Sequence, residues 1–231
     1  EAKRKQWLEG DWDVTEGAAF PEFDRLVHTC DPFPIPKTWP RFRAADWGYQ
    51  QPACILWFAI DYNNDLWVYR ELYFNKTTAD VAANLIRQAE KDDPRPMRGV
   101  MDSSVWAKRG DPGPTIAEVM NRAGLAFRPS DRSPTSRLAG KAEVHRRLML
   151  DPVTKRPRLK VFNTCLNLIA TLPTLPLDET HLEDVDTKAD DHAYDALRYG
   201  LMSRPLSPGK NFSSWGNVIS TGQPRISDPT F

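Results

Sequence analysis

Acidic residues in three parts of the chain could together bind divalent metal ions. Asp46 ends the apolar stretch RFRAAD, and Asp102 ends the stretch RGVMD. If Asp190 caps a helix in the segment ADDHAYDALRY, Asp191 and Asp195 are four residues apart and share one helical face. Oxygen ligands of this kind favour Mg²⁺ or Mn²⁺ over zinc, and His192 could be a further ligand or orient a phosphate.

Asp46 and Asp102 each have a simpler explanation as well. Asp46 could pair with Arg41 or Arg43, and Asp102 could cap a turn at the end of a strand. The two aspartates are more informative together, because catalytic groups collect at the strand ends of α/β sheets. We therefore expect a shared site if the two strands are neighbours.

The acids of the last segment have an alternative explanation too. Acidic residues are favoured in the first turn of any helix, and Arg198 could neutralise Asp195 or Asp191. Asp195 fits this explanation less well, because it lies beyond the first turn and is repelled by Asp191. A lone histidine at a helix start, such as His192, is more often a surface or hydrogen-bonding residue. The sequence thus ranks Asp195 as the third ligand, Asp191 as the fourth and His192 last.

The hydrophobic pattern predicts the elements that must position these residues. Apolar runs separated by turn residues indicate three consecutive strands, two of them joined as a hairpin through DYNND. These strands are expected at 41–46, 52–60 and 65–74, with shorter ones at 98–102 and 125–127, helices at 79–91, 115–124, 139–150, 165–172 and 190–203, and a basic hairpin-like stretch at 151–162. This order predicts an α/β domain in which an antiparallel hairpin joins parallel strands.

The length of 231 residues and the 40% hydrophobic content suit one domain with appendages. We expect this domain at 41–204. A proline-dense linker or surface wrap is expected at 1–40, and a flexible tail rich in Pro, Ser and Gly at 205–231. The chain starts at a glutamate, which suggests a piece of something longer.

The remaining composition excludes several classes. The odd number of widely spaced cysteines, Cys30, Cys54 and Cys165, argues against a disulfide framework or a zinc ribbon and suits an intracellular setting. Neither a membrane span nor a signal peptide is present in the sequence.

The equal totals of 31 acidic and 31 basic residues hide a local asymmetry. Residues 128–160 hold ten basic side chains against three acidic ones, whereas residues 178–195 hold eight acidic against one basic. A basic stretch can grip phosphates, while the acidic one would repel a polyanion unless divalent cations bound there. A solvated face is the alternative for the basic stretch. The expected DNA-binding residues are Arg128, Arg132, Arg137, Lys141, Arg146, Lys155, Arg156 and Arg158.

The ordered set AADWG, GVMDS and ADDHAYDALRY resembles the nuclease domain of the large terminase subunit of tailed bacteriophages. The resemblance runs from about Trp7 to about Ser203. It implies a ribonuclease H-like fold, with a central mixed sheet that starts with three antiparallel strands and is flanked by helices. It also implies an endonuclease that cuts concatemeric double-stranded viral DNA during genome packaging.

The resemblance also implies roles for the acidic residues. Asp46, Asp102 and Asp195 would be catalytic and, with Asp191 or His192, would hold two Mg²⁺ or Mn²⁺ ions for phosphodiester hydrolysis. The third ligand is the least secure, because members of the family differ in which residue of the D-D-H-x-x-D run binds metal.

The same resemblance implies partners beyond the DNA. The sequence has no G-x-x-x-x-G-K-[ST] phosphate loop, so the ATPase motor would be a missing domain in cis. The small terminase subunit and the portal are further expected partners, in the host cytoplasm. Two alternatives stay open, namely another ribonuclease H-like enzyme such as a junction resolvase or transposase, and a non-catalytic docking module whose carboxylates pair with Arg41, Arg43 and Arg198.

Overall fold

A mixed sheet of seven strands forms the centre of the computed structural model, which describes residues 17–94, 96–108, 113–181 and 183–206. The strand order is β1-β7-β4-β3-β2-β5-β6. Strands β2, β3 and β4 are antiparallel neighbours, and the other pairings are parallel. The strands are β1 (Thr29–Cys30), β2 (Arg41–Asp46), β3 (Ala53–Ile60), β4 (Leu66–Phe74), β5 (Arg98–Met101), β6 (Ala126–Pro129) and β7 (Leu159–Phe162).

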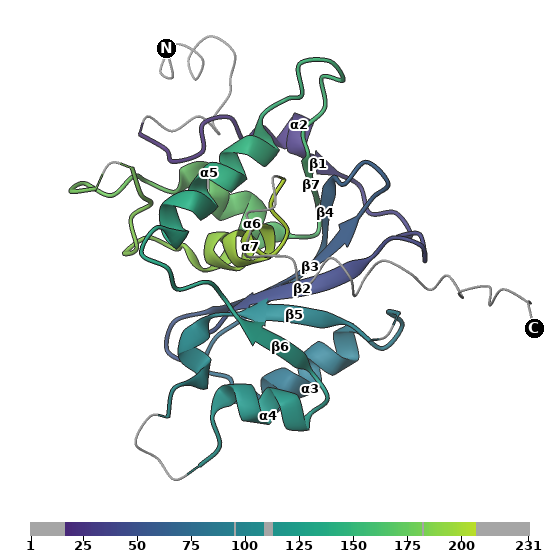
Figure 1. The fold of residues 1–231 in the computed structure, drawn as a ribbon, viewed down its shortest axis with the longest axis vertical. Helices are drawn as coiled ribbons and strands as arrows, with labels where there is room; N and C mark the ends of the chain where they lie inside the picture. Colours follow the sequence, from purple (N-terminus) through teal and green to yellow (C-terminus); the bar gives the residue numbers. More distant parts are fainter. Residues whose placement is uncertain (1–16, 95, 109–112, 182, 207–231) are drawn as a thin grey trace, which may run out of the picture.

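Helices cover both faces of this sheet. Figure 1 shows α5, α6 and α7 on one side and α3 and α4 on the other. The α-helices are α2 (Arg25–His28), α3 (Ala79–Ala89), α4 (Ile116–Arg122), α5 (Ser136–Leu148), α6 (Leu166–Thr171) and α7 (His192–Met202), and two short 3₁₀ helices are η1 (Ser103–Trp106) and η2 (Leu172–Thr174). No helix within the described ranges has the length and apolarity to cross a membrane.

The alternation of side chains along β2 decides which residues face α7. Phe42 and Ala44 share a face with Asp46 at period two, as the sequence predicts. Phe42 stacks on Phe58 of β3, with ring centroids 4.8 Å apart, and α7 packs over this pair. A Cβ added at Gly200 of α7 would lie 2.5 Å from the Phe58 ring, so only glycine permits so close an approach.

The opposite face of β2 carries a buried ionic network. Nη1 of Arg43 lies 2.8 Å from Oε1 of Glu90, and both side chains are 1% exposed. The indole Nε1 of Trp57 donates to the same Oε1 at 2.9 Å, and Arg41 pairs with Asp93.

The expectation that Arg41 or Arg43 neutralises Asp46 is therefore wrong. Odd and even positions of a strand point to opposite faces, so the two arginines and Asp46 cannot meet across the sheet.

Two strands extend the sheet beyond the elements expected from the sequence. The stretch 151–162 is hairpin-like only in its first part, where Leu150 and Pro157 form an antiparallel bridge. Its second part is β7, which pairs in parallel with β4 and with β1. A four-residue strand with few alternations gives too weak a local pattern to be assigned without its neighbours.

The described part of segment 1–40 packs on the domain. Phe20 and Phe23 are buried, and the Phe20 ring lies 5.2 Å from that of Tyr194 in α7. Residues 1–16 and, in the expected tail 205–231, residues 207–231 lie outside the described ranges. The domain boundaries stay a prediction.

Candidate metal centre

The acids of β2 and β5 lie side by side at one edge of the sheet. The two strands run in parallel, so their carboxyl ends share this edge. The backbone N of Asp102 donates to the carbonyl of Ala45 at 3.1 Å, directly beside Asp46. The carboxylate of Asp102 also accepts from the backbone N of Ser104 at 3.1 Å and from its hydroxyl, so it caps η1 as well.

The start of α7 brings further acids to the same edge. Asp191 is the N-cap residue of the helix but makes no capping hydrogen bond through its side chain. The sequence predicts Asp190 at this position; instead, its carboxylate accepts a 2.6 Å hydrogen bond from the Tyr73 hydroxyl of β4. Nδ1 of His192 lies 3.0 Å from Oδ2 of Asp46, which fixes α7 to the end of β2.

Asp195 is held by arginines from two helices. Nε and Nη2 of Arg198 lie 3.0 and 2.9 Å from its Oδ1, and Nη1 of Arg137 lies 3.9 Å from its Oδ2. This confirms the expected pairing of Arg198 with Asp195. The buried stem of Arg198 lies against Gly140 of α5, where an added Cβ would be 2.4 Å from its Cγ. Gly140 was not predicted from the sequence, although a glycine inside a helical pattern is a recognisable signal of close packing.

Burial and mutual repulsion perturb the carboxylates of this edge. The pKa of Asp46 is raised mainly by burial, with contributions from Asp195 and Asp102, and the hydrogen bond from His192 opposes the rise. Burial and then the charge of Asp195 raise the pKa of Asp191 to about 7. The hydrogen bond with Asp46 raises the pKa of His192. Such a group of destabilised anions would be relieved by a bound cation.

The donor chemistry of this edge suits a hard divalent cation, because the ligands on offer are carboxylate oxygens. As they stand, no three Asp, Glu, His or Cys side chains of the described residues converge in an arrangement that could hold a metal ion. The carboxylates of Asp102, Asp46 and Asp195 turn instead to Ser104, to His192 and to Arg198. Their side chains would therefore have to rotate to converge on an ion.

Part of the expected DNA-binding set lies near this edge. Arg137 and Lys141 project from the first half of α5 toward the loop before α7, where Nε of Arg137 lies 2.7 Å from Oδ2 of Asp184. Arg132 is exposed in the connection from β6 to α5. Arg128 lies on β6, next to Val100 of β5.

The rest of that set lies elsewhere. Arg146 is on the last turn of α5 and pairs with Glu143. Lys155, Arg156 and Arg158 precede β7, whose first residue pairs with the first residue of β4. Strands β4 and β2 run in the same direction on either side of β3, so these three residues lie at the edge opposite Asp46. The fold therefore does not bring the basic stretch together as one surface.

Comparisons with known proteins give structural matches alone, since no family model and no curated protein sequence matches the chain. The phage P22 large terminase nuclease domain has a TM-score of 0.64 and 20% identity, covering 82% of this chain and 93% of its own. The ADP-bound large terminase of a thermophilic bacteriophage has 0.67 and 17%, covering 90% and 52%. The large terminase nuclease of another thermophilic phage, G20c, with bound cobalt has 0.57 and 12%, covering 80% and 96%.

The mixed sheet, its antiparallel three-strand segment and its flanking helices place the chain in the ribonuclease H-like class, as the sequence predicts. Within that class, its fold is that of the nuclease domain of phage large terminases. The chain spans about half the length of the ADP-bound large terminase that it matches.

Proposed function

We propose that this chain is a divalent-metal-dependent endonuclease, the nuclease domain of a large terminase that cuts concatemeric double-stranded DNA during phage genome packaging. The observation that carries the proposal is the buried acidic group at the carboxyl ends of β2 and β5, facing the start of α7. The terminase fold and the cobalt and zinc bound to the G20c nuclease support it.

Asp46, Asp102 and Asp191 are the residues we propose to hold the ions. The ranking of the last two acids changes from the one based on sequence. Asp195 is compensated by Arg198 and Arg137, whereas the largely buried carboxylate of Asp191 makes no capping bond. A carboxylate without a close basic partner gains most from a metal ion. Asp195 then contributes mainly charge, unless it leaves Arg198.

The proposed chemistry is hydrolysis of a phosphodiester. Two Mg²⁺ or Mn²⁺ ions, when bound, would activate water and stabilise the leaving oxygen. The chain's own residues position the reaction: His192 orients Asp46, Ser104 orients Asp102, and Arg198 orients Asp195. Arg137 stands between α5 and Asp195, where it could also contact a phosphate of the DNA.

Further parts of the proposal concern partners. Two of the matched structures are large terminases of a thermophilic bacteriophage that contain ADP or ATP-gamma-S, and about half of each lies outside the match. We propose an ATPase motor in cis for this protein as well. The small terminase subunit and the portal are its proposed partners in the host cytoplasm.

Cutting of supercoiled plasmid in Mn²⁺ tests the activity. We expect the wild-type chain to cut, and Asp102→Ala to lose cutting while its circular dichroism spectrum and melting temperature show that it is folded. Equal activity of mutant and wild type would contradict the proposal. A strong preference for four-way junctions over plasmid would favour a resolvase instead.

A further inference from the structure

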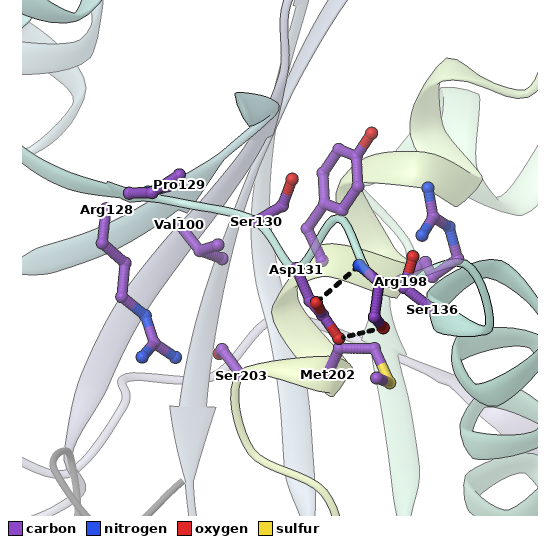
Figure 2. A pocket seen from close by; sticks show the side chains of 11 residues that line it. Val100, Arg128, Pro129, Ser130, Asp131, Ser136, Arg198, Met202 and Ser203 are labelled. Carbon is purple, nitrogen blue, oxygen red and sulfur yellow. Dashed lines mark hydrogen bonds between the residues drawn. The ribbon is translucent and has the colours of Figure 1, made fainter. Parts of the chain in front are cut away.

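A pocket of about 330 Å³ lies beside the metal centre, between the end of β6, the start of α5 and the second half of α7. Figure 2 shows Arg128 on one side of it and Ser136, Arg198 and Met202 on the other. Arg198 is shared, since its guanidinium pairs with Asp195 and its side chain lines the pocket. The pocket is therefore continuous with the proposed metal centre.

The pocket lies within one or two nucleotides of the proposed reaction. Asp195 and Met202 are seven residues apart on α7, which corresponds to about 10 Å along the helix. The pocket also follows β6 at the edge where β2 and β5 end, because the three strands are parallel neighbours. A DNA strand that lies across this edge would therefore pass the pocket.

The chemistry of the walls matches one nucleotide. Arg128 can contact a phosphate, and the hydroxyls of Ser130 and Ser136 can hydrogen-bond to phosphate or sugar. Tyr199 and Met202 add apolar surface of the kind on which a sugar or base can pack.

Electrostatics favour an anion at the Arg128 side of the pocket. Burial, and then the charge of Arg204, lower the pKa of Arg128 to about 10. An anion would offset both effects. Among the described residues of the wall the one carboxylate is Asp131, which already accepts two hydrogen bonds from Ser133, each 2.9 Å long (Figure 2).

We propose that this pocket binds one nucleotide of the DNA strand, close to the nucleotide at which the strand is cut. Arg128 and the serine hydroxyls hold its phosphate, and Tyr199 and Met202 contact its sugar or base. The inference rests on the proposed nuclease function and adds a substrate subsite to it.

A second pocket provides a matched control. It has a volume of about 800 Å³ and lies at the opposite edge of the sheet, lined by Arg156 and Arg158 together with Asp61, Asp65 and Asp151. The sequence places Arg156 and Arg128 in one basic stretch, but the fold separates them. Of these two arginines, Arg128 is the one close to the metal centre.

The experiment measures DNA affinity by fluorescence anisotropy with a labelled duplex in Ca²⁺, over a series of salt concentrations. We expect Arg128→Ala to weaken binding by about tenfold and to reduce the slope of log K against log salt by about 1. Arg156→Ala should bind within about twofold of wild type, in line with the near-neutral effect of a charge remote from the DNA. Ser133→Trp, at an exposed position on the pocket rim, should also weaken binding because the indole fills the entrance.

Wild-type affinity in both Arg128→Ala and Ser133→Trp would overturn the inference, as would an equal loss in Arg156→Ala. Plasmid cutting by the wild-type chain is measured alongside. If the wild type cuts and Asp102→Ala does not, the nuclease proposal holds whatever the pocket variants do. The two proposals can thus fail separately.

Discussion

Nδ1 of His192 lies 3.0 Å from Oδ2 of Asp46, and this contact joins the first residue of α7 to the last residue of β2 across 146 positions of sequence. Both side chains are largely buried, with 17% and 13% of their surface exposed. The histidine therefore fixes the direction of the carboxylate. This role differs from direct metal ligation, and the difference can be measured.

If His192 orients Asp46 from outside the metal shell, His192→Ala should weaken Mn²⁺ binding by about 10- to 100-fold, the usual effect of losing such a partner. Asp46→Ala should abolish binding altogether. Isothermal titration with Mn²⁺ measures both. Binding lost as completely in His192→Ala as in Asp46→Ala would mean that the histidine is a ligand itself.

The carboxylate of Asp191 should make stability depend on pH in metal-free buffer. Its pKa is about 7 in the folded chain against an ordinary 3.8, so the folded state holds this proton more tightly than the unfolded state does. The wild type should therefore lose stability as pH rises from about 4 to 7. Asp191→Asn removes this loss and should be more stable than wild type at pH 8 by up to about 4 kcal/mol.

Urea unfolding at pH 4 and pH 8, with EDTA present, measures this effect. At pH 4 the two proteins should differ little, because the carboxyl is then mostly protonated when folded. A difference of the same size at both values would show that the substitution acts through packing instead of charge.

The fit of Arg198 against Gly140 should appear as an interaction energy between the two positions. Gly140→Ala places a Cβ 2.4 Å from Cγ of Arg198 and should destabilise the domain by about 1–3 kcal/mol. In an Arg198→Ala background the clash is absent, so the same substitution should cost little. A double-mutant cycle of unfolding free energies measures this coupling. Additive effects would contradict it.

The ionic network under α3 should be important for stability and irrelevant to metal binding. Glu90→Ala leaves Arg43 buried without its carboxylate and should cost about 3–5 kcal/mol. Thermal unfolding measures the loss, and Mn²⁺ titration below the lowered melting temperature should match wild type. Weaker Mn²⁺ binding in the folded variant would mean that the two faces of β2 are coupled.

The local pattern of the sequence was sufficient for most of the fold near the site. Strands that end in Asp46 and Asp102, and a helix that carries Asp191 and Asp195, can be read from periodicity and from the cost of an acid in an apolar strand. The packing of α7 through Ala193, Leu197 and Gly200 follows from the same periodicity and is confirmed. These features depend on residues at most a few positions apart.

Only the tertiary structure decided which charges meet. It pairs Arg43 with Glu90 and Asp195 with Arg198, buries Asp191 at an N-cap position where its side chain caps nothing, and divides one basic stretch between opposite edges of the sheet. It also adds β1 and β7, whose pairing joins segments more than 100 residues apart. The physical reason is that an ion pair or a strand neighbour depends on where the chain returns in space. Local periodicity carries no information about that return.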